Sequence, residues 1–241
     1  MTTLLFQADS YLREFDAMVT ATDDGARTVT LDQTAFYPGG GGQPHDTGTL
    51  RAGERSWPVE RVEKRGGEVV HLLGGDGPLP EPGEAVCGKL DWERRYRLMR
   101  THTAMHVLCG AIWREFGAQV TGGQMYLDRA RMDFELDDLN PERVRQIEER
   151  ANAAIAAGAP VTVRILPREE AFAIPDLIRT KINLLPEGLA EVRVVSVGEL
   201  DTQADGGTHV ADAREVGGIR VVGTRSKGKI NKRLEVELID G

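Results

Sequence analysis

The sequence has few cysteines and no long apolar run. Its only cysteines, Cys87 and Cys109, form no CxxC pair. This excludes a disulfide framework, and we expect both to be buried thiols among apolar neighbours. No apolar run approaches the ~18 residues of a transmembrane helix, and residues 1–10 lack the charged-then-apolar pattern of a signal peptide. We therefore expect a cytoplasmic protein.

The chain also lacks an excess of positive charge. Its formal net charge of −8 argues against broad, nonspecific nucleic-acid binding. Local basic clusters are present nevertheless. One lies around a predicted Ser-Lys-Gly-Lys turn at residues 226–229, where Gly228 lets the backbone and two lysines approach a phosphate together. The other, which we interpret as a solvated face, comprises Arg94, Arg95, Arg97 and Arg100.

No internal repeat or low-complexity tract is present, and the pattern of the chain changes near residue 90. Before it, alternating runs at residues 17–22, 28–31, 59–62 and 68–72 predict strands, and residues 74–83 form a loop rich in glycine and proline. These features predict a small β-barrel domain over residues 1–90. The rest of the chain, residues 91–241, is predicted to form a separate domain.

Helical periodicity appears in this second part. A stripe of apolar residues predicts a helix over residues 92–116 that Gly117 ends, and Gly110 interrupts its sequence. A second helix is predicted from an Asn140 cap to Gly158. Alternation then predicts strands at residues 161–166, 192–197, 219–224 and 234–239. The expected fold class is α+β, with a two-layer second domain around a mainly antiparallel sheet.

Two short segments each space two metal-binding side chains four positions apart. His102 and His106 fall in the predicted helix, where residues i and i+4 share one face. About a hundred residues later, Asp205 and His209 are expected to complete the site from a loop and a helix start. Either pair alone is weak evidence, because helical histidines often border a core and Asp-Gly-Gly is often a turn. Together they match a four-ligand metal site.

A glycine-rich segment at residues 34–48 is the second conspicuous pattern. It does not match the GxGxxG fingerprint, and Pro44 disfavours a following helix, so a dinucleotide site is rejected. The alternatives are a flexible hairpin loop or a main chain that approaches a partner closely. Gln43 offers a donor and an acceptor directly after the glycines. Neither His45 in this segment nor His71 has an obvious ligand partner in the sequence.

Both patterns occur, in this order, in a known family. Over nearly its whole length the chain resembles the free-standing alanyl-tRNA editing proteins, called AlaX, which are similar to the editing domain of alanyl-tRNA synthetase. The motifs that carry the resemblance lie at residues 9–15, 31–38 with the glycine run, 100–106, 128–134, 175–181, 206–210 and 226–229. With a glycine-rich domain and a metal domain but no synthetase core, the chain resembles the medium-length type. The editing domain of threonyl-tRNA synthetase shares only the metal motif.

The resemblance implies hydrolysis of the ester that joins serine or glycine to the tRNA for alanine, independent of ATP. It implies one zinc ion per chain, held by His102, His106, Asp205 and His209. It also implies that the Thr34 hydroxyl senses the substrate's side chain, and that Gln43 shapes the same pocket. Other residues expected to contact substrate or tRNA are Gly39, Gly40, Gly41, Gly42, Gly206, Gly207, Thr208, Lys227 and Lys229.

Two further expectations concern the backbone amides and the assembly state. The amides of Gly206 and Gly207 are expected to stabilise the developing oxyanion. A monomer is expected, because the chain ends at Gly241 without the C-terminal dimerisation domain of longer family members.

One residue departs from the family pattern, which usually has cysteine where this chain has Asp205. A carboxylate keeps the thiolate's charge and is an acceptable zinc ligand, but its harder oxygen predicts tolerance of other divalent ions. If Asp205 does not bind, the three histidines leave an open coordination position. If it does, substrate or water enters as a fifth ligand or displaces it, or the metal mainly anchors the substrate.

Two other functions stay open. The chain could be a tRNA-binding module with lapsed catalysis, in which Asp205 marks decay of the site, although the retained histidines argue against this. It could also be a metal hydrolase of small aminoacyl esters. The lysine-rich tail favours an RNA substrate instead.

Overall fold

The computed structural model describes residues 2–127, 129–183, 185 and 188–239. Asp128, in the motif at residues 128–134, and Gly241 lie outside the described residues. Contacts between residues divide the chain into two compact units, Met1–Arg97 and Leu98–Gly241. Helix α1 (Trp92–Phe116) contributes to both units, and a domain boundary at residue 90 stays a prediction.

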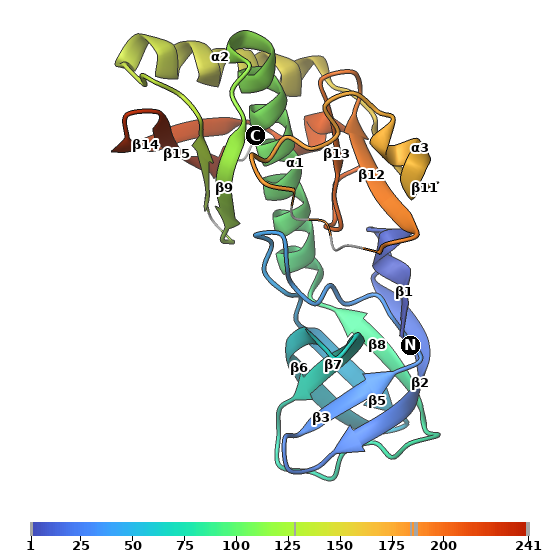
Figure 1. Ribbon diagram of the computed structural model, residues 1–241. Helices are drawn as coiled ribbons and strands as arrows, with labels where there is room; N and C mark the ends of the chain where they lie inside the picture. The colour runs from blue at the N-terminus through green and yellow to red at the C-terminus, as the bar shows by residue number, and fades with distance from the viewer. Residues whose placement is uncertain (1, 128, 184, 186–187, 240–241) are drawn as a thin grey trace. The chain divides into compact units, whose positions relative to one another are not determined.

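The first unit contains a closed antiparallel barrel (Figure 1). Its strands follow one another around the barrel in the order β2-β3-β7-β6-β5-β8. Their bounds are β2 (Glu14–Asp23), β3 (Thr28–Leu31), β5 (Gly48–Ala52), β6 (Arg55–Arg65), β7 (Glu68–Leu73) and β8 (Ala85–Leu90). The predicted barrel is confirmed, and all four predicted strands lie on observed ones.

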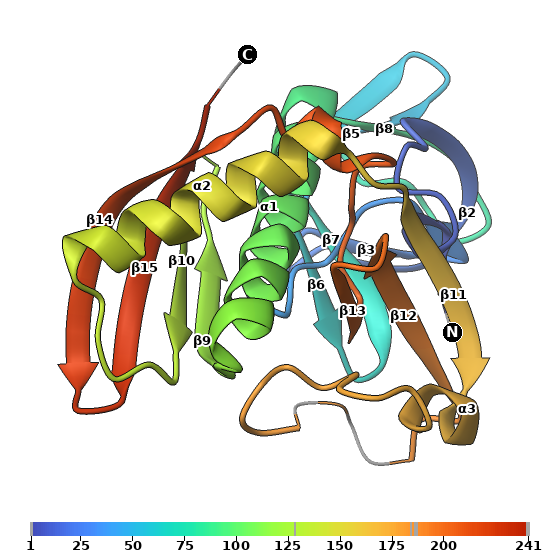
Figure 2. The ribbon, with the colours of Figure 1, turned by 90° about the horizontal axis from the view of Figure 1, so that it is seen from above.

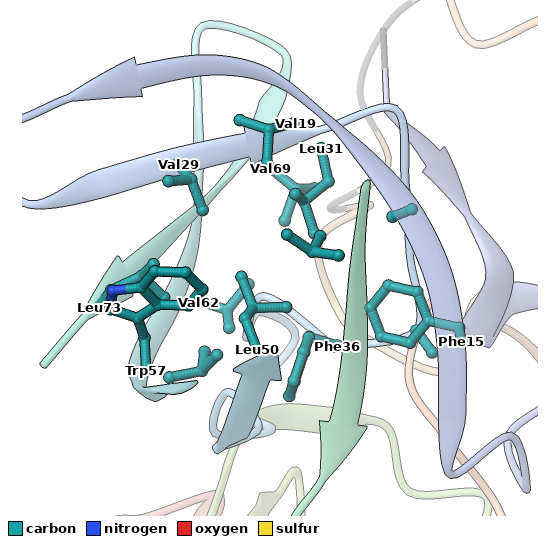
Figure 3. Packing of buried hydrophobic residues seen from close by; sticks show 14 of the residues in the cluster. Phe15, Val19, Val29, Leu31, Phe36, Leu50, Trp57, Val62, Val69 and Leu73 are labelled. Carbon is teal, nitrogen blue, oxygen red and sulfur yellow. The ribbon is translucent and has the colours of Figure 1, made fainter. Parts of the chain in front are cut away.

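The barrel core forms because successive side chains of a strand point to opposite faces. Alternate residues of each strand therefore fill the interior, and the loop residue Phe36 packs among them (Figure 3). Each such large apolar side chain contributes roughly 1.5–3 kcal/mol when it is fully buried. The members labelled in the figure are Phe15, Val19, Val29, Leu31, Phe36, Leu50, Trp57, Val62, Val69 and Leu73.

The same alternation corrects one prediction. Strand β8 turns Val86 and Leu90 inward, so Cys87 between them lies on the other face and is only half-buried. The expectation of two buried thiols is confirmed for Cys109 and wrong for Cys87. Both cysteines are free.

The glycine-rich segment contains a tight, hydrogen-bonded turn at residues 40–43. It follows β4 (Gln33–Thr34), which pairs with β1 (Thr3–Leu4) just before the short helix η1 (Leu5–Gln7). Gly40 and Gln43 exchange backbone hydrogen bonds with N–O distances of 3.1 and 2.9 Å. Gly41 and Gly42, at φ +56° and +89°, occupy the two turn positions, where any other residue is strained. The Tyr37 hydroxyl donates to the Gly40 carbonyl at 2.9 Å.

A buried ion pair anchors this segment to the start of α1. The Arg95 guanidinium, with no exposed surface, donates through Nε to both carboxylate oxygens of Asp46 at 3.1 and 3.0 Å. Its other nitrogens donate to the carbonyls of Ser10 and Ala35, and Asp46 also accepts from the Tyr37 amide at 2.7 Å. The prediction of a solvated arginine face is therefore wrong for Arg95.

The second unit has two antiparallel sheets on either side of α1 (Figure 2). The four-stranded sheet has the order β14-β15-β10-β9, and the three-stranded sheet has the order β11-β12-β13. Their bounds are β9 (Val120–Met125), β10 (Arg129–Phe134), β14 (Ile219–Gly228), β15 (Asn231–Leu238), β11 (Val161–Pro167), β12 (Glu191–Val197) and β13 (Asp201–Ala204). The predicted α+β class and antiparallel pairing are confirmed.

Both long helices have the predicted ends. Helix α1 stops before Gly117, whose φ is +62°. Helix α2 (Pro141–Ala157), which packs on β14, begins after Asn140, whose side chain accepts from the Arg143 amide at 2.9 Å. A short α3 (Arg168–Phe172) follows β11. None of the helices in the described part of the chain combines the length and apolarity needed to cross a membrane.

Candidate metal centre

The second unit brings the two predicted ligand pairs together. His102 and His106 lie one turn apart on α1, and their ring centroids are 5.2 Å apart. Asp205 directly follows β13, and His209 lies in the irregular segment before the short helix η2 (Ala213–Val216). The predicted loop position of Asp205 is confirmed, but His209 does not start a helix. Asp212 caps η2 instead, because its side chain accepts from the Arg214 amide at 2.8 Å.

The Nε2 atoms of the three histidines converge on the Asp205 carboxylate. His209 Nε2 is 3.0 Å from Oδ1, and His102 Nε2 and His106 Nε2 are 3.4 and 4.0 Å from Oδ2. Each of the four residues offers a ligand atom within 4.8 Å of every other. The three histidines are buried, and the Asp205 side chain is 16% exposed.

This donor set fits a divalent transition metal. Tetrahedral zinc holds nitrogen and oxygen donors at about 2.0–2.2 Å, which places the donors roughly 3.3 Å from one another. The distances of 3.0 to 4.0 Å between the Asp205 carboxylate oxygens and the histidine Nε2 atoms bracket that value. Three imidazoles with one carboxylate suit zinc and related ions better than the oxygen-only sets of calcium or magnesium.

The protonation states of two ligands also suit metal binding. Burial opposes ionisation of Asp205, but the charge and hydrogen bonds of His102 and His209 hold the pKa of its carboxyl well below the usual value. Burial, followed by the charges of His102 and His106, holds the pKa of His209 well below its usual value. Asp205 is therefore ionised and His209 neutral at neutral pH, which are the forms that bind metals.

Three more residues surround the ligands, and the sequence did not reveal them. Asp201 Oδ2 lies 2.9 Å from His106 Nδ1, and Thr103 Oγ1 lies 3.2 Å from His209 Nδ1. Arg193 donates through Nη1 to the backbone carbonyl of Asp205 at 3.0 Å. The strand period of two puts Asp201 and Gln203 on the same side as Asp205, which was the available signal for Asp201.

The glycines after Asp205 serve the site locally. The Gly207 amide donates to Asp205 Oδ1 at 2.7 Å, so it fixes the carboxylate in this structure. A Cβ added at Gly206 would meet no atom within 4 Å. Thr208 has no exposed surface. The oxyanion role expected for the Gly206 and Gly207 amides stays a prediction.

In the first unit, the predicted substrate-sensing residues are buried. Thr34 has no exposed surface, and Gln43 is 2% exposed. The Thr34 hydroxyl contacts His71 Nε2 at 2.9 Å and accepts from the Phe36 amide at 3.1 Å. Burial lowers the pKa of His71 to about 4, so this ring is neutral at pH 7. His71, which had no evident partner in the sequence, thus bonds to Thr34.

The predicted RNA-binding lysines lie at one end of the four-stranded sheet. Strand β14 continues to Gly228, so the turn of its hairpin consists of Lys229 and Ile230 and not of residues 226–229. Lys227 donates to Asp133 Oδ2 at 2.9 Å, and Arg233 donates to Oδ1 at 2.6 Å. These bonds lower the pKa of Asp133 to about 2, and the bond from Arg233 has the largest effect. Lys229 is exposed.

Comparisons with known proteins identify the family of the chain. Residues 7–94 match the family of class II (A) tRNA synthetases, and residues 192–235 match the second additional domain of threonyl and alanyl tRNA synthetases. The chain is 40% identical over 247 residues to the alanyl-tRNA editing protein AlaX-M of Methanosarcina acetivorans, with 100% of both chains covered. It is 38% identical to AlaX-M of Saccharolobus solfataricus, which covers 97% of this chain and 98% of that protein. It is also 42% identical to 25% of the alanine–tRNA ligase of Pyrobaculum neutrophilum, over 90% of this chain. The chain therefore belongs to the AlaX-M family of alanyl-tRNA editing proteins.

Proposed function

We propose that this protein is a metal-dependent deacylase that hydrolyses seryl- or glycyl-tRNA for alanine in trans. The observation that carries the proposal is the convergence of three histidine Nε2 atoms on the ionised Asp205, in a chain of the AlaX-M family. His102, His106 and His209 would hold the metal, together with Asp205. A bound divalent metal, zinc first, supplies Lewis-acid chemistry for hydrolysis of the ester.

The need for such an activity follows from the limits of side-chain recognition. A site that activates alanine cannot exclude the smaller glycine, and it rejects an added hydroxyl only weakly. A second site must therefore remove both errors and spare alanine. Polar contacts that accept serine disfavour alanine, because its methyl group leaves them unpaired. The family resemblance alone assigns this recognition to Thr34 and Gln43, whose side chains are buried in this structure.

The tRNA contacts are proposed at the β14–β15 hairpin. Lys229 is exposed at its turn, whereas Lys227 is paired with Asp133. Replacing Lys229 by alanine should weaken tRNA binding and lower the slope of log affinity against log salt by about 1. Lys227→Ala should have a smaller effect, since the Lys227 ammonium group already donates a hydrogen bond to Asp133 and is held away from a phosphate.

A matched control tests whether this effect is local. Lys64, exposed on β6, allows the same loss of charge in the other unit. Lys64→Ala should leave the salt slope unchanged. Equal effects of Lys64→Ala and Lys229→Ala would show that net charge, and not the hairpin, governs tRNA binding.

The experiment that tests the proposal measures deacylation of seryl-, glycyl- and alanyl-tRNA for alanine. The protein is assayed as purified, after chelator treatment, and after reloading with zinc. We expect activity to disappear with the metal, to return with it, and to spare alanyl-tRNA. Binding of tRNA without turnover in any state would instead identify a lapsed binding module. Equal cleavage of small seryl esters and seryl-tRNA would identify a hydrolase of small esters.

A further inference from the structure

Asp201 is a buried acidic residue that contacts one of the four metal-binding residues. Its side chain has no exposed surface, and Oδ2 lies 2.9 Å from Nδ1 of His106. A carboxylate oxygen only accepts, so this contact requires a hydrogen on His106 Nδ1. In the neutral ring the lone pair then lies on Nε2, the atom that faces Asp205.

Several neighbours hold Asp201 in this position. The Gln203 side chain donates through Nε2 to Asp201 Oδ2 at 2.7 Å. The Arg179 guanidinium, itself stacked over Trp113 at 4.4 Å, places Nε 3.5 Å from Oδ1. Strand β13 fixes the backbone, because Asp201 pairs with Val197 of β12. Strand β13 and the Gln203 side chain thus orient the carboxylate, and Arg179, from the loop before β12, supplies a positive charge beside Oδ1 without a hydrogen bond.

Helix α1 makes room for this carboxylate at Gly110. Gly110 lies one turn after His106, on the same face of the helix. A Cβ at this position would stand 2.7 Å from the Leu200 carbonyl oxygen and 3.1 Å from Asp201 Cβ. Any larger residue would push the start of β13 away from the helix. The glycine that interrupts the predicted helix therefore permits the contact between Asp201 and His106.

We propose that Asp201 is a positioning residue that orients His106 Nε2 toward a bound metal and increases the affinity of the site for it. The inference rests on the metal site of the proposed function. Carboxylates that accept from the second nitrogen of a ligating histidine typically change metal affinity by 10- to 100-fold. We therefore expect Asp201→Ala to weaken zinc binding by about 10- to 100-fold and Asp201→Asn, which keeps an acceptor oxygen, to weaken it less.

The test measures zinc affinity of the whole chain by competition with a chromogenic chelator, with circular dichroism as a check of folding. Asp133→Asn is the matched control, because it removes another buried carboxylate, 5% exposed, whose ion pairs are with Arg131, Lys227 and Arg233 and not with the four metal-binding residues. It should bind zinc like the unaltered protein. Gly110→Ala keeps both Asp201 and His106, and should weaken zinc binding by displacing β13. The visible spectrum of the cobalt-loaded protein should change in Asp201→Ala and not in Asp133→Asn.

A double-mutant cycle separates positioning from a general loss of stability. In a His106→Ala background, Asp201→Ala should weaken zinc binding no further, because the ring that it orients is gone. Unchanged affinity in Asp201→Ala, or the same loss with and without His106, would overturn the inference while leaving the metal site intact. If the unaltered protein binds neither zinc nor cobalt, the metal site of the proposed function fails, and this inference fails with it.

Discussion

The two units bury histidine for different ends. In the barrel unit, both nitrogens of His71 have protein partners: Nδ1 lies 3.3 Å from the Val29 carbonyl, and Nε2 lies 2.9 Å from the Thr34 hydroxyl. In the second unit, Asp201 and Thr103 contact the Nδ1 atoms of two histidines, whose Nε2 atoms face Asp205. An imidazole ring such as that of His71, whose two nitrogens bond to a backbone carbonyl and a hydroxyl, stabilises a core. A ring with only Nδ1 held in this way presents Nε2 as a ligand.

The surroundings of these buried histidines also differ in charge. Burial lowers the pKa of His71 to about 4 against the opposing hydrogen bond to the Val29 carbonyl, and none of the acidic residues that the structure describes contributes to this shift. The candidate metal centre has the Asp205 carboxylate, whose pKa lies well below its usual value despite burial. Burial of a neutral ring requires only hydrogen bonds, whereas burial of several histidines around one carboxylate creates a place for a cation.

The largest effect is expected when a ligand is removed from the second unit. His209→Ala should abolish stoichiometric zinc binding and lower deacylation by at least about a thousandfold, equivalent to roughly 4 kcal/mol of transition-state stabilisation. The measurements are metal content by elemental analysis and single-turnover deacylation of seryl-tRNA. His71→Gln is the contrasting variant, and it should retain its zinc. Full activity of His209→Ala would contradict the metal centre.

The second prediction concerns Asp205, the carboxylate that the three histidines of the second unit surround. Asp205→Ala should lower zinc affinity by about tenfold or more, a change of at least roughly 1.4 kcal/mol. Asp205→Cys should retain or increase zinc affinity, since a thiolate has the same charge and is a softer donor. Isothermal titration with zinc measures both. Affinities equal to that of the unaltered protein in both variants would remove Asp205 from the ligands and leave a three-histidine site.

The features that the sequence predicted correctly are local ones. Local patterns identified α1 to its last residue, the cap of α2 and the ligand pairs, because each depends on neighbours within one turn or one strand. Strand β9 contains Gly122 and Gly123, which weaken the strand pattern, and it was not predicted.

The missed contacts all depend on packing between distant segments. Asp201 and His106 are 95 residues apart, and Thr34 and His71 are 37 residues apart. Neither separation along the chain matches a sequence motif. The two residues of each pair come into contact only through strand pairing and through the packing of β13 against α1. The half-buried state of Cys87 depends on which face of β8 turns inward, and apolar neighbours alone do not fix this.

The pH dependence of the barrel's stability follows from His71. Its pKa is about 4 in the folded unit against 6.5 for an ordinary histidine, so the unfolded chain binds the proton more readily. This contribution to the free energy of unfolding is complete above pH 6.5 and declines as the pH falls toward 4, by about 3 kcal/mol in total. His71→Gln should flatten this decline.

Urea titrations between pH 7.5 and 4 measure the effect. Trp57, 3% exposed in the barrel core, reports on this unit when Trp92 and Trp113 are replaced by phenylalanine. Identical pH profiles with and without His71 would show that its neutral form is not required. The same titrations should show no dependence on zinc, in contrast to unfolding of the second unit.

The last effect, expected from substitutions of Thr34, separates the roles of the two units. Because His71 Nδ1 bonds to the Val29 carbonyl, it carries the hydrogen, and Nε2 accepts from the Thr34 hydroxyl. Thr34→Val removes this donor and leaves Nε2 buried without it, which should lower the free energy of unfolding of the barrel by about 1–3 kcal/mol. Thr34→Ser keeps the hydroxyl and should cost less. Both variants should bind zinc normally, while Thr34→Val should lose activity on seryl-tRNA relative to glycyl-tRNA. A valine variant as stable as the unaltered protein would show that the hydrogen bond between Thr34 and His71 does not hold the barrel, and an unchanged serine-to-glycine ratio would remove Thr34 from substrate recognition.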